Sequence, residues 1–162
     1  MVSKEDIAAV IYKIKDPEIP TLSIVDLGIV TKIEVDKNPI YVQLTPTFAG
    51  CPALKVIEDS VKEALEENFP SLEFEVETSF ETQWTTDRLT TKGKQSLLDH
   101  GLAPPESGKD RIELDVLSDV ACPQCSSRNT VLKSPFGATL CRTIHYCNNC
   151  LESFEAFKPV TA

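Results

Sequence analysis

The sequence predicts an α+β protein: a small α-β-β-α-β domain with helices on a mixed sheet, followed by a C-terminal zinc ribbon. Three observations carry this prediction. Segments with helical and with strand periodicity alternate over the first half of the chain. Two C-x-x-C pairs lie near the C-terminus, and the 162 residues suffice for one ordinary domain with a small appendage.

The first element is predicted to be an amphipathic helix. Ser3 and Asp6 have the spacing of a capping box. Apolar residues then recur with helical spacing at Ile7, Val10, Ile11 and Ile14. The next segment, DPEIP at 16–20, is expected to form a turn or an extended loop, because proline disfavours helix in the residue before it.

Two strands, a second helix and a third strand follow. Residues 29–35 and 40–44 are expected to form a hairpin around the turn Lys37-Asn38-Pro39. From Pro52 the apolar residues take a helical period, which ends before Pro70. The segment LEFEVET then alternates strictly, which predicts a strand at 72–78.

The rest of the chain divides into short pieces. A helix is predicted at about 90–99 and ends at Gly101, and a short strand is predicted at 112–117. The stretch Pro104-Pro105-Glu106-Ser107-Gly108 has the composition of a linker. The predicted domains are therefore residues 1–103, a linker with a short strand at 104–117, and the zinc ribbon at 118–162.

Composition and charge exclude several classes of protein. The net charge is −9, and residues 118–162 carry +1, so the rest of the chain carries −10. Such an acidic domain is a poor ligand for phosphate backbones, which argues against nucleic acid as a partner. No apolar run reaches the roughly 20 residues that span a membrane, and the N-terminus does not resemble a signal peptide. We therefore expect a cytoplasmic protein with reduced thiols.

The C-terminal cysteines have the spacing of a metal site. Cys122 and Cys125 form one C-x-x-C pair and Cys147 and Cys150 the other, and such pairs place four thiolates around one tetrahedral ion, most simply a structural zinc. Iron in the same geometry, buried cysteines and disulfides are the alternatives. Two residues between the pairs, Cys141 and His145, each could replace one ligand. Phe154 and Phe157 are expected to form the small core of the ribbon, with a partner-binding patch as the second interpretation.

The sixth cysteine stands apart from the others. Pro52 suits the first position of a helix, which places Cys51 at or near the N-cap. Backbone N–H groups and the helix dipole would then lower the thiol pKa below its usual value of about 8.5. Asp16, Glu18 and Asp26 lie at element ends and could line one cleft with Cys51, although such residues most often form turns. A buried filler at a helix start is the other interpretation of Cys51.

Two stretches carry a resemblance to a known family. DPEIPTLSIVDLGIV (16–30) and TPTFAGCPA (45–53) resemble the domain shared by bacterial SufT-type and eukaryotic cytosolic iron–sulfur assembly factors. WTTDRLTTKGKQSLLDHGLAPP and the cysteine-rich tail extend the likeness to the whole chain, which resembles the PaaD family of accessory proteins encoded with the phenylacetyl-CoA epoxidase. Ser126 departs from this family, in which glycine is commoner after the second cysteine.

The resemblance implies a role in maturing the epoxidase system of aerobic phenylacetate breakdown, rather than catalysis of the epoxidation. The implied partners are the di-iron oxygenase, the [2Fe–2S] reductase or both, together with other iron–sulfur assembly proteins. The reactive cysteine of the family falls on Cys51, which would hold iron or a cluster transiently. A structural subunit of the oxygenase complex, a nucleic-acid-binding zinc ribbon and a thiol oxidoreductase are the alternatives.

Overall fold

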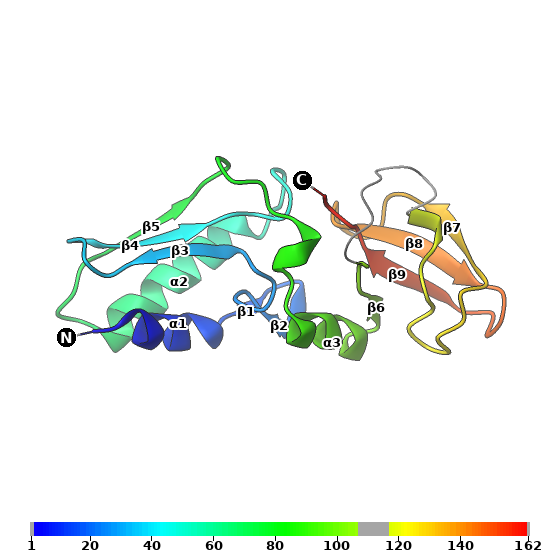
Figure 1. Ribbon diagram of the computed structural model, residues 1–162, viewed down its shortest axis with the longest axis horizontal. Coiled ribbons are helices and arrows are strands. Elements are labelled where there is room, and N and C mark those ends of the chain that lie inside the picture. Colours follow the sequence, from blue (N-terminus) through cyan, green and yellow to red (C-terminus); the bar gives the residue numbers. More distant parts are fainter. Residues whose placement is uncertain (1, 107–116, 162) are drawn as a thin grey trace. The chain divides into compact units, whose positions relative to one another are not determined.

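The computed structural model describes residues 2–106 and 117–161 (Figure 1). The chain forms two compact units, residues 1–84 and residues 85–162. Residues 1–84 hold 7 lysines and arginines against 16 aspartates and glutamates, so this unit carries the whole net charge of −9. Within the described ranges, no helix is both long and apolar enough to cross a membrane.

The N-terminal unit contains two helices and five strands among its described residues. In chain order they are α1 (Lys4–Tyr12), β1 (Lys15–Asp16), β2 (Ile19–Ser23), β3 (Val30–Glu34), β4 (Ile40–Leu44), α2 (Leu54–Asn68) and β5 (Phe74–Thr78). The predicted helix at the N-terminus is confirmed, and so is its capping box. The Ser3 hydroxyl accepts a hydrogen bond from the Asp6 N–H (3.2 Å), and the Asp6 carboxylate accepts one from the Ser3 N–H (2.9 Å).

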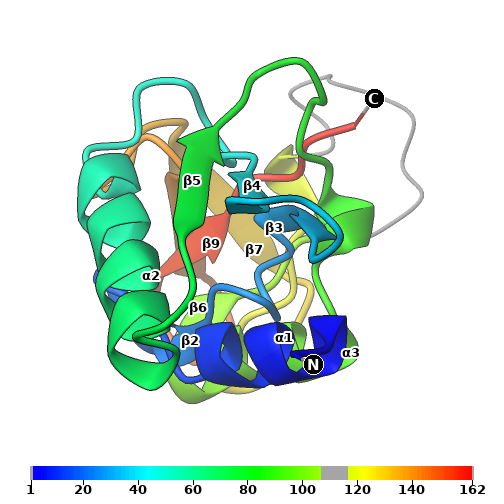
Figure 2. The same cartoon turned by 90° about the vertical axis from the view of Figure 1, so that its left-hand side faces the viewer.

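A mixed three-stranded sheet, in the order β3-β4-β5, forms the centre of this unit. The predicted hairpin is confirmed, because β3 and β4 are antiparallel, whereas β5 lies parallel to β4. Helices α1 and α2 lie along one side of the sheet (Figure 2), where Ile40, Val42 and Leu44 are buried. Since β4 and β5 are parallel and joined through α2, their carboxyl ends lie at the same edge of the sheet.

One hairpin was not predicted. Residues 16–20 were expected to form a turn or an extended loop, but β1 and β2 pair as an antiparallel hairpin. The Asp16 carboxylate closes its turn by accepting hydrogen bonds from the N–H groups of Glu18 (2.8 Å) and Ile19 (3.0 Å). Pro17 and Pro20 interrupt the strand pattern in the sequence, which explains why periodicity did not reveal this hairpin.

The C-terminal unit is a four-stranded sheet preceded by short helices. Its described elements are η1 (Thr86–Arg88), α3 (Thr91–Asp99), β6 (Leu102–Ala103), β7 (Thr130–Ser134), β8 (Arg142–Cys147) and β9 (Ser153–Phe157). The sheet order is β6-β9-β8-β7. The predicted helix at about 90–99 is confirmed as α3. Gly101, which follows it, has a φ of +82°, a conformation that suits glycine after a helix.

The boundary between the units differs from the predicted domain limit at residue 103. Leu102 and Ala103 of β6 pair with Glu155 and Ala156 of β9, so α3 and β6 belong with the ribbon. A strand of two residues has no detectable periodicity in a sequence. The strand expected at 112–117 lies outside the described residues, apart from its last position.

The core of the C-terminal unit is small. Ala103, Phe154 and Ala156 pack with two of the cysteines, Cys122 and Cys147. Phe154 and Phe157 are 6% and 3% exposed, which confirms their predicted role in the core of the ribbon. A core of this size provides little hydrophobic stabilisation, and the unit therefore needs another source of stability.

Candidate metal centre and the Cys51 loop

The four C-terminal cysteines lie on two tight turns of the same geometry. One turn precedes β7, and the other connects β8 to β9. Two backbone hydrogen bonds of 2.8–2.9 Å close each turn: Ser126 N–H to Cys122 O and Cys122 N–H to Ser127 O in the first, and Leu151 N–H to Cys147 O and Cys147 N–H to Glu152 O in the second. The repeated pattern turns both cysteines of each pair toward the same point.

Each turn is completed by a residue in the left-handed backbone region. Ser126 has a φ of 60° and Leu151 a φ of 63°. Residues with a Cβ atom adopt this region at a cost, whereas glycine adopts it freely. This conformation explains why glycine is commoner in the resembled family at the position after the second cysteine, where this chain has Ser126.

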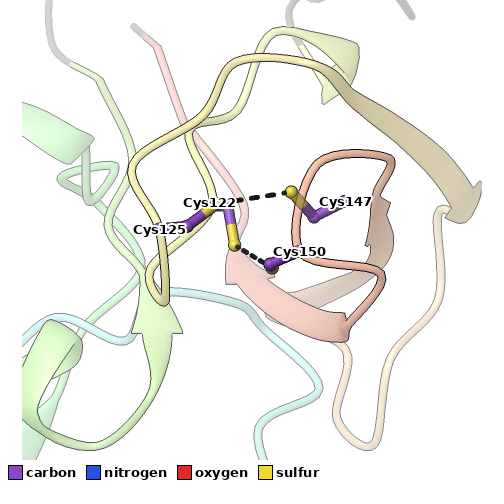
Figure 3. Close-up of side chains that lie close together, drawn as sticks. All are labelled: Cys122, Cys125, Cys147 and Cys150. Carbon is purple, nitrogen blue, oxygen red and sulfur yellow. Dashed lines mark hydrogen bonds between the residues drawn. The ribbon is translucent and has the colours of Figure 1, made fainter.

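The sulfur atoms have the separations of ligands around a single ion. The Cys122 and Cys150 sulfurs are 3.7 Å apart, the Cys125 and Cys147 sulfurs are 3.6 Å apart, and all four lie within 4.8 Å of one another (Figure 3). A tetrahedron with Zn–S bonds of about 2.3 Å has sulfurs about 3.8 Å apart, whereas a disulfide bond measures about 2.05 Å. The geometry thus fits a metal centre and excludes disulfides between these cysteines.

The surroundings of the cluster separate the pKa values of two of its thiols. The Ser127 backbone N–H and the Asn149 side chain donate to Cys125 and lower the pKa of its thiol to about 6. At Cys150 the Glu152 backbone N–H lowers the pKa, but burial and the neighbouring cysteines raise it to about 12. A bound cation displaces these protons, so metal binding at this cluster competes with protonation.

The two other candidate ligands of the ribbon do not join the cluster. Within the described ranges, the four cysteines are the group whose ligand atoms lie close enough to hold one ion. His145 is fully buried on β8, where its Nε2 lies 2.8 Å from the Thr143 hydroxyl and its ring stacks on Phe154. Cys141 is half-buried, with its sulfur 3.0 Å from the Thr139 hydroxyl.

Cys51 lies in the loop between β4 and α2, near the N-cap of α2 as expected but not at the cap itself. Helix α2 begins at Leu54 with Ala53 as its N-cap, so Cys51 stands two positions before the cap. The intervening residues form a turn, in which the Cys51 carbonyl accepts a hydrogen bond from the Leu54 N–H at 3.4 Å. Because the effect of the helix dipole falls off within the first turn, this position weakens the predicted dipole effect on the half-buried thiol.

The three candidate carboxylates serve local structure. Asp16 closes the β1–β2 turn, and Asp26, which is 7% exposed, accepts a hydrogen bond from the Tyr12 hydroxyl at 2.8 Å. Glu18 is half-buried within the same turn as Asp16. Across residues 2–106 and 117–161, these carboxylates and Cys51 do not form a group that could hold an ion.

Sequence reasoning also missed the residue that connects two of these loops. Thr45 is 1% exposed, its hydroxyl lies 3.0 Å from that of Thr31, and its N–H donates to the Ile29 carbonyl at 2.7 Å. This bond joins the start of the Cys51 loop to the end of the Asp26 loop. The threonine directly after a strand was the available signal.

The fold and the cysteine cluster define a two-part chain, an α+β unit followed by a unit with a four-cysteine metal centre, and comparisons with known proteins identify the family of each part. Residues 4–76 match the family described as iron–sulfur cluster assembly protein, and residues 107–158 match the PaaD zinc beta ribbon domain. A protein of Escherichia coli (strain K12), provisionally named as one of the subunits of 1,2-phenylacetyl-CoA epoxidase, is 35% identical over 94% of this chain and 91% of its own length. The chain belongs to this PaaD family.

Other relatives match the N-terminal part. The Fe-S protein maturation auxiliary factor YitW of Bacillus subtilis (strain 168) is 32% identical over 58% of this chain and 92% of its own. A solved domain of unknown function, DUF59, from Bacillus anthracis aligns with a TM-score of 0.53 and 29% identity, over 58% of this chain and 90% of its own. A conserved hypothetical protein from Thermotoga maritima aligns with a TM-score of 0.51 and 30% identity, over 59% and 94%.

Proposed function

We propose that this protein is a cytoplasmic accessory factor that delivers iron or an iron–sulfur cluster to the phenylacetyl-CoA epoxidase system. The recipient is the di-iron oxygenase, the [2Fe–2S] reductase or both. Cys51 is the transfer ligand, and Cys122, Cys125, Cys147 and Cys150 hold a structural zinc. Membership of the PaaD family and the match of residues 4–76 to the assembly family support this proposal.

The observation that carries the proposal is the place of Cys51 in a loop at one edge of the sheet. The loop from β4 to α2 leaves the sheet at the edge where the parallel strands β4 and β5 both end. In α/β units this edge is where loops form binding and reactive sites. Gly50 and Pro52 on either side of Cys51 are exposed, so a partner can approach the sulfur.

The nature of the site favours transfer over storage. Stable clusters are held by four cysteine ligands, whereas this loop offers one, and Asp16 and Asp26 accept hydrogen bonds within their own loops. A cluster or iron ion bound through the Cys51 thiolate therefore keeps exchangeable positions. Thiolates or carboxylates of the recipient then bind at these exchangeable positions one after another, and the last of them displaces the Cys51 thiolate. This ligand exchange does not change the oxidation state of the iron.

The ribbon metal has a different role. Four thiolates fill all positions of a tetrahedral ion, which leaves no open position for chemistry. The core around it is small, so metal binding contributes directly to the folding free energy of this unit. We therefore assign the ribbon a structural zinc, which metal analysis of the purified protein tests directly.

The experiment compares recipients purified from three strains: wild type, a strain that lacks this protein, and one carrying Cys51→Ala. Iron and acid-labile sulfide are measured in the oxygenase and in the reductase. We expect a deficit in at least one recipient in both altered strains, while the variant itself keeps its zinc and its fold. Normal metal content in the Cys51→Ala strain would rule out the transfer role.

A second function is favoured by one observation. The Escherichia coli relative bears the name of an epoxidase component, which suggests a structural place in the complex. A structural component would co-purify with the oxygenase in a fixed ratio and would be needed for activity after the metals are loaded. A maturation factor would be dispensable once loading is complete. Adding the protein to fully loaded oxygenase and reductase separates the two roles.

A further inference from the structure

The exposed hydrophobic side chains of the N-terminal unit gather at one end. Among the large hydrophobic residues described in 2–84, two are exposed: Val56 at 54% and Phe80 at 59%. Single exposed apolar residues are common on protein surfaces and need no explanation. Two such residues at the same end of the unit as the Cys51 loop do need an explanation.

The chain fixes the position of Val56 relative to the Cys51 loop, and a hydrogen bond fixes that of Phe80. Val56 is the third residue of α2, five positions after Cys51. Phe80 follows Ser79, whose N–H donates to the Leu44 carbonyl at 2.8 Å, at the point where β4 enters this loop. The segments after β4 and after β5 leave the sheet at the same end (Figure 1).

A further bond joins α2, which carries Val56, to the end of β5, two residues before Phe80. The Thr78 hydroxyl at the end of β5 donates to the Glu58 carboxylate of α2 at 2.9 Å. The first turns of α2 are thereby held against the end of β5, from which the segment with Phe80 continues. Val56 and Phe80 thus flank the Cys51 loop from α2 and from the segment after β5. We call these two residues the apolar pair.

The charges around the apolar pair are mainly negative. Lys55 forms ion pairs with Glu58 (3.2 Å) and Asp59 (2.8 Å), and Glu81, next to Phe80, is exposed. One cation thus stands among three carboxylates. The whole unit carries −9, so a second copy of this chain would meet a surface of the same sign.

We propose that the apolar pair is the docking surface for the protein that receives the iron or cluster from Cys51. This inference rests on the function proposed above and identifies the recognition chemistry. The recipient presents an apolar patch bordered by lysine or arginine, next to the ligands that accept the metal. One half-buried thiol provides no specificity by itself, and ligand exchange requires the recipient's ligands at bonding distance from Cys51. Docking on both sides of the loop meets both requirements.

The test measures binding of this protein to the metal-free reductase and to the metal-free oxygenase. Val56→Ser and Phe80→Ser are compared with Phe136→Ser, which changes another exposed phenylalanine (68%) in the other unit. We expect each variant of the apolar pair to weaken binding to the recipient by about tenfold or more, and the control by less than about twofold. Circular dichroism and zinc content verify that all variants fold.

The salt dependence of binding to the recipient is an independent test of the docking surface. Binding should weaken as salt is added, and Glu81→Lys should weaken it further and reduce its salt dependence, since rim charges steer a basic partner. Unchanged binding of Phe80→Ser to both recipients would overturn the docking surface. So would sedimentation showing that the wild-type protein self-associates and that Phe80→Ser abolishes the association.

The same variants separate this inference from the function on which it rests. Cys51→Ala should bind the recipients as wild type does but fail to load them, whereas Phe80→Ser should keep wild-type alkylation of Cys51 and lose binding. If Cys51→Ala loads the recipients normally, the proposed function fails. If only Cys51→Ala is defective and Phe80→Ser binds and loads normally, the docking surface alone fails.

Discussion

Leu151 occupies a backbone conformation in which a leucine is costly. Its φ of 63° places it in the left-handed region, and its side chain is 67% exposed, so packing offsets little of that cost. Leu151→Gly should therefore raise the free energy of unfolding of the C-terminal unit by about 1 kcal/mol. Denaturant unfolding of the zinc-loaded protein, followed by far-ultraviolet circular dichroism, measures this change.

Gly101 provides the control of opposite sign. It has a φ of +82°, and a Cβ atom added there would meet nothing within 4 Å, so Gly101→Ala adds backbone strain without a clash. We expect this variant to lose about 1 kcal/mol. If both substitutions shifted stability in the same direction, left-handed strain would not explain either position.

At the scale of elements, the loop between β7 and β8 depends on one glycine. The Gly137 N–H donates to the Arg142 carbonyl at 2.9 Å, and the next residue, Ala138, donates its N–H to the Glu155 carboxylate at 2.9 Å. Glu155 also pairs with Arg142 at 3.0 Å. The loop backbone is thus held directly against the two sheet residues Arg142 and Glu155.

A side chain at this glycine should disrupt the loop. A Cβ atom on residue 137 would lie 2.7 Å from the Arg142 Cβ and 2.8 Å from the Glu155 Oε1. Gly137→Ala should lower the free energy of unfolding by about 1–3 kcal/mol, because the loop must move away from both groups. Ala138→Ser, at the exposed neighbouring position, is the matched control and should change stability by less than about 0.5 kcal/mol. Equal stability of the two variants would contradict this account.

The helices and strands show what sequence periodicity can predict. The strand at 40–44 and the helix at about 90–99 were predicted correctly, since each has enough residues to display its period. The hairpin of β1 and β2 was missed because a carboxylate–backbone turn creates it, and β6 was missed because its two residues find their partner only in the tertiary fold. Both depend on contacts that no local pattern encodes.

The four-cysteine cluster and the Cys51 loop also differ in how well the sequence predicted them. Spacing alone predicted that Cys122, Cys125, Cys147 and Cys150 lie together, and the structure brings their sulfurs within 4.8 Å, because each C-x-x-C pair is a local turn. The position of Cys51 depends on where α2 begins, and helix boundaries are the least certain part of a sequence prediction. Its grouping with the carboxylates stays a prediction about function, since the structure uses Asp16 and Asp26 within their own loops.

At the scale of the whole molecule, the two units have different sources of stability. The N-terminal unit buries many large side chains completely, among them Ile7, Ile11, Leu22 and Leu65. Among its described residues the C-terminal unit buries fewer, and two of the four clustered cysteines, Cys122 and Cys147, are part of its core. Metal removal should therefore affect one unit and spare the other, because metal binding supplies folding free energy only where the ligands lie.

Trp84 makes this difference measurable. It is the one tryptophan of the chain, it is 1% exposed, and its indole N–H donates to the Leu27 carbonyl at 2.9 Å within the N-terminal unit. On chelation of the ribbon metal, or in Cys147→Ser, tryptophan emission should stay that of a buried indole. Amide hydrogen exchange should meanwhile accelerate in β8 and β9.

The behaviour of α3 and β6 in that experiment decides where the units divide. Because β6 is hydrogen-bonded to β9, α3 and β6 should lose protection together with the ribbon when the metal is removed. If the division lies at residue 103, as the sequence predicted, α3 should instead keep its protection together with α1 and α2. A shift of the Trp84 emission on chelation would contradict the separation itself, since it would mean that the metal also stabilises the N-terminal unit.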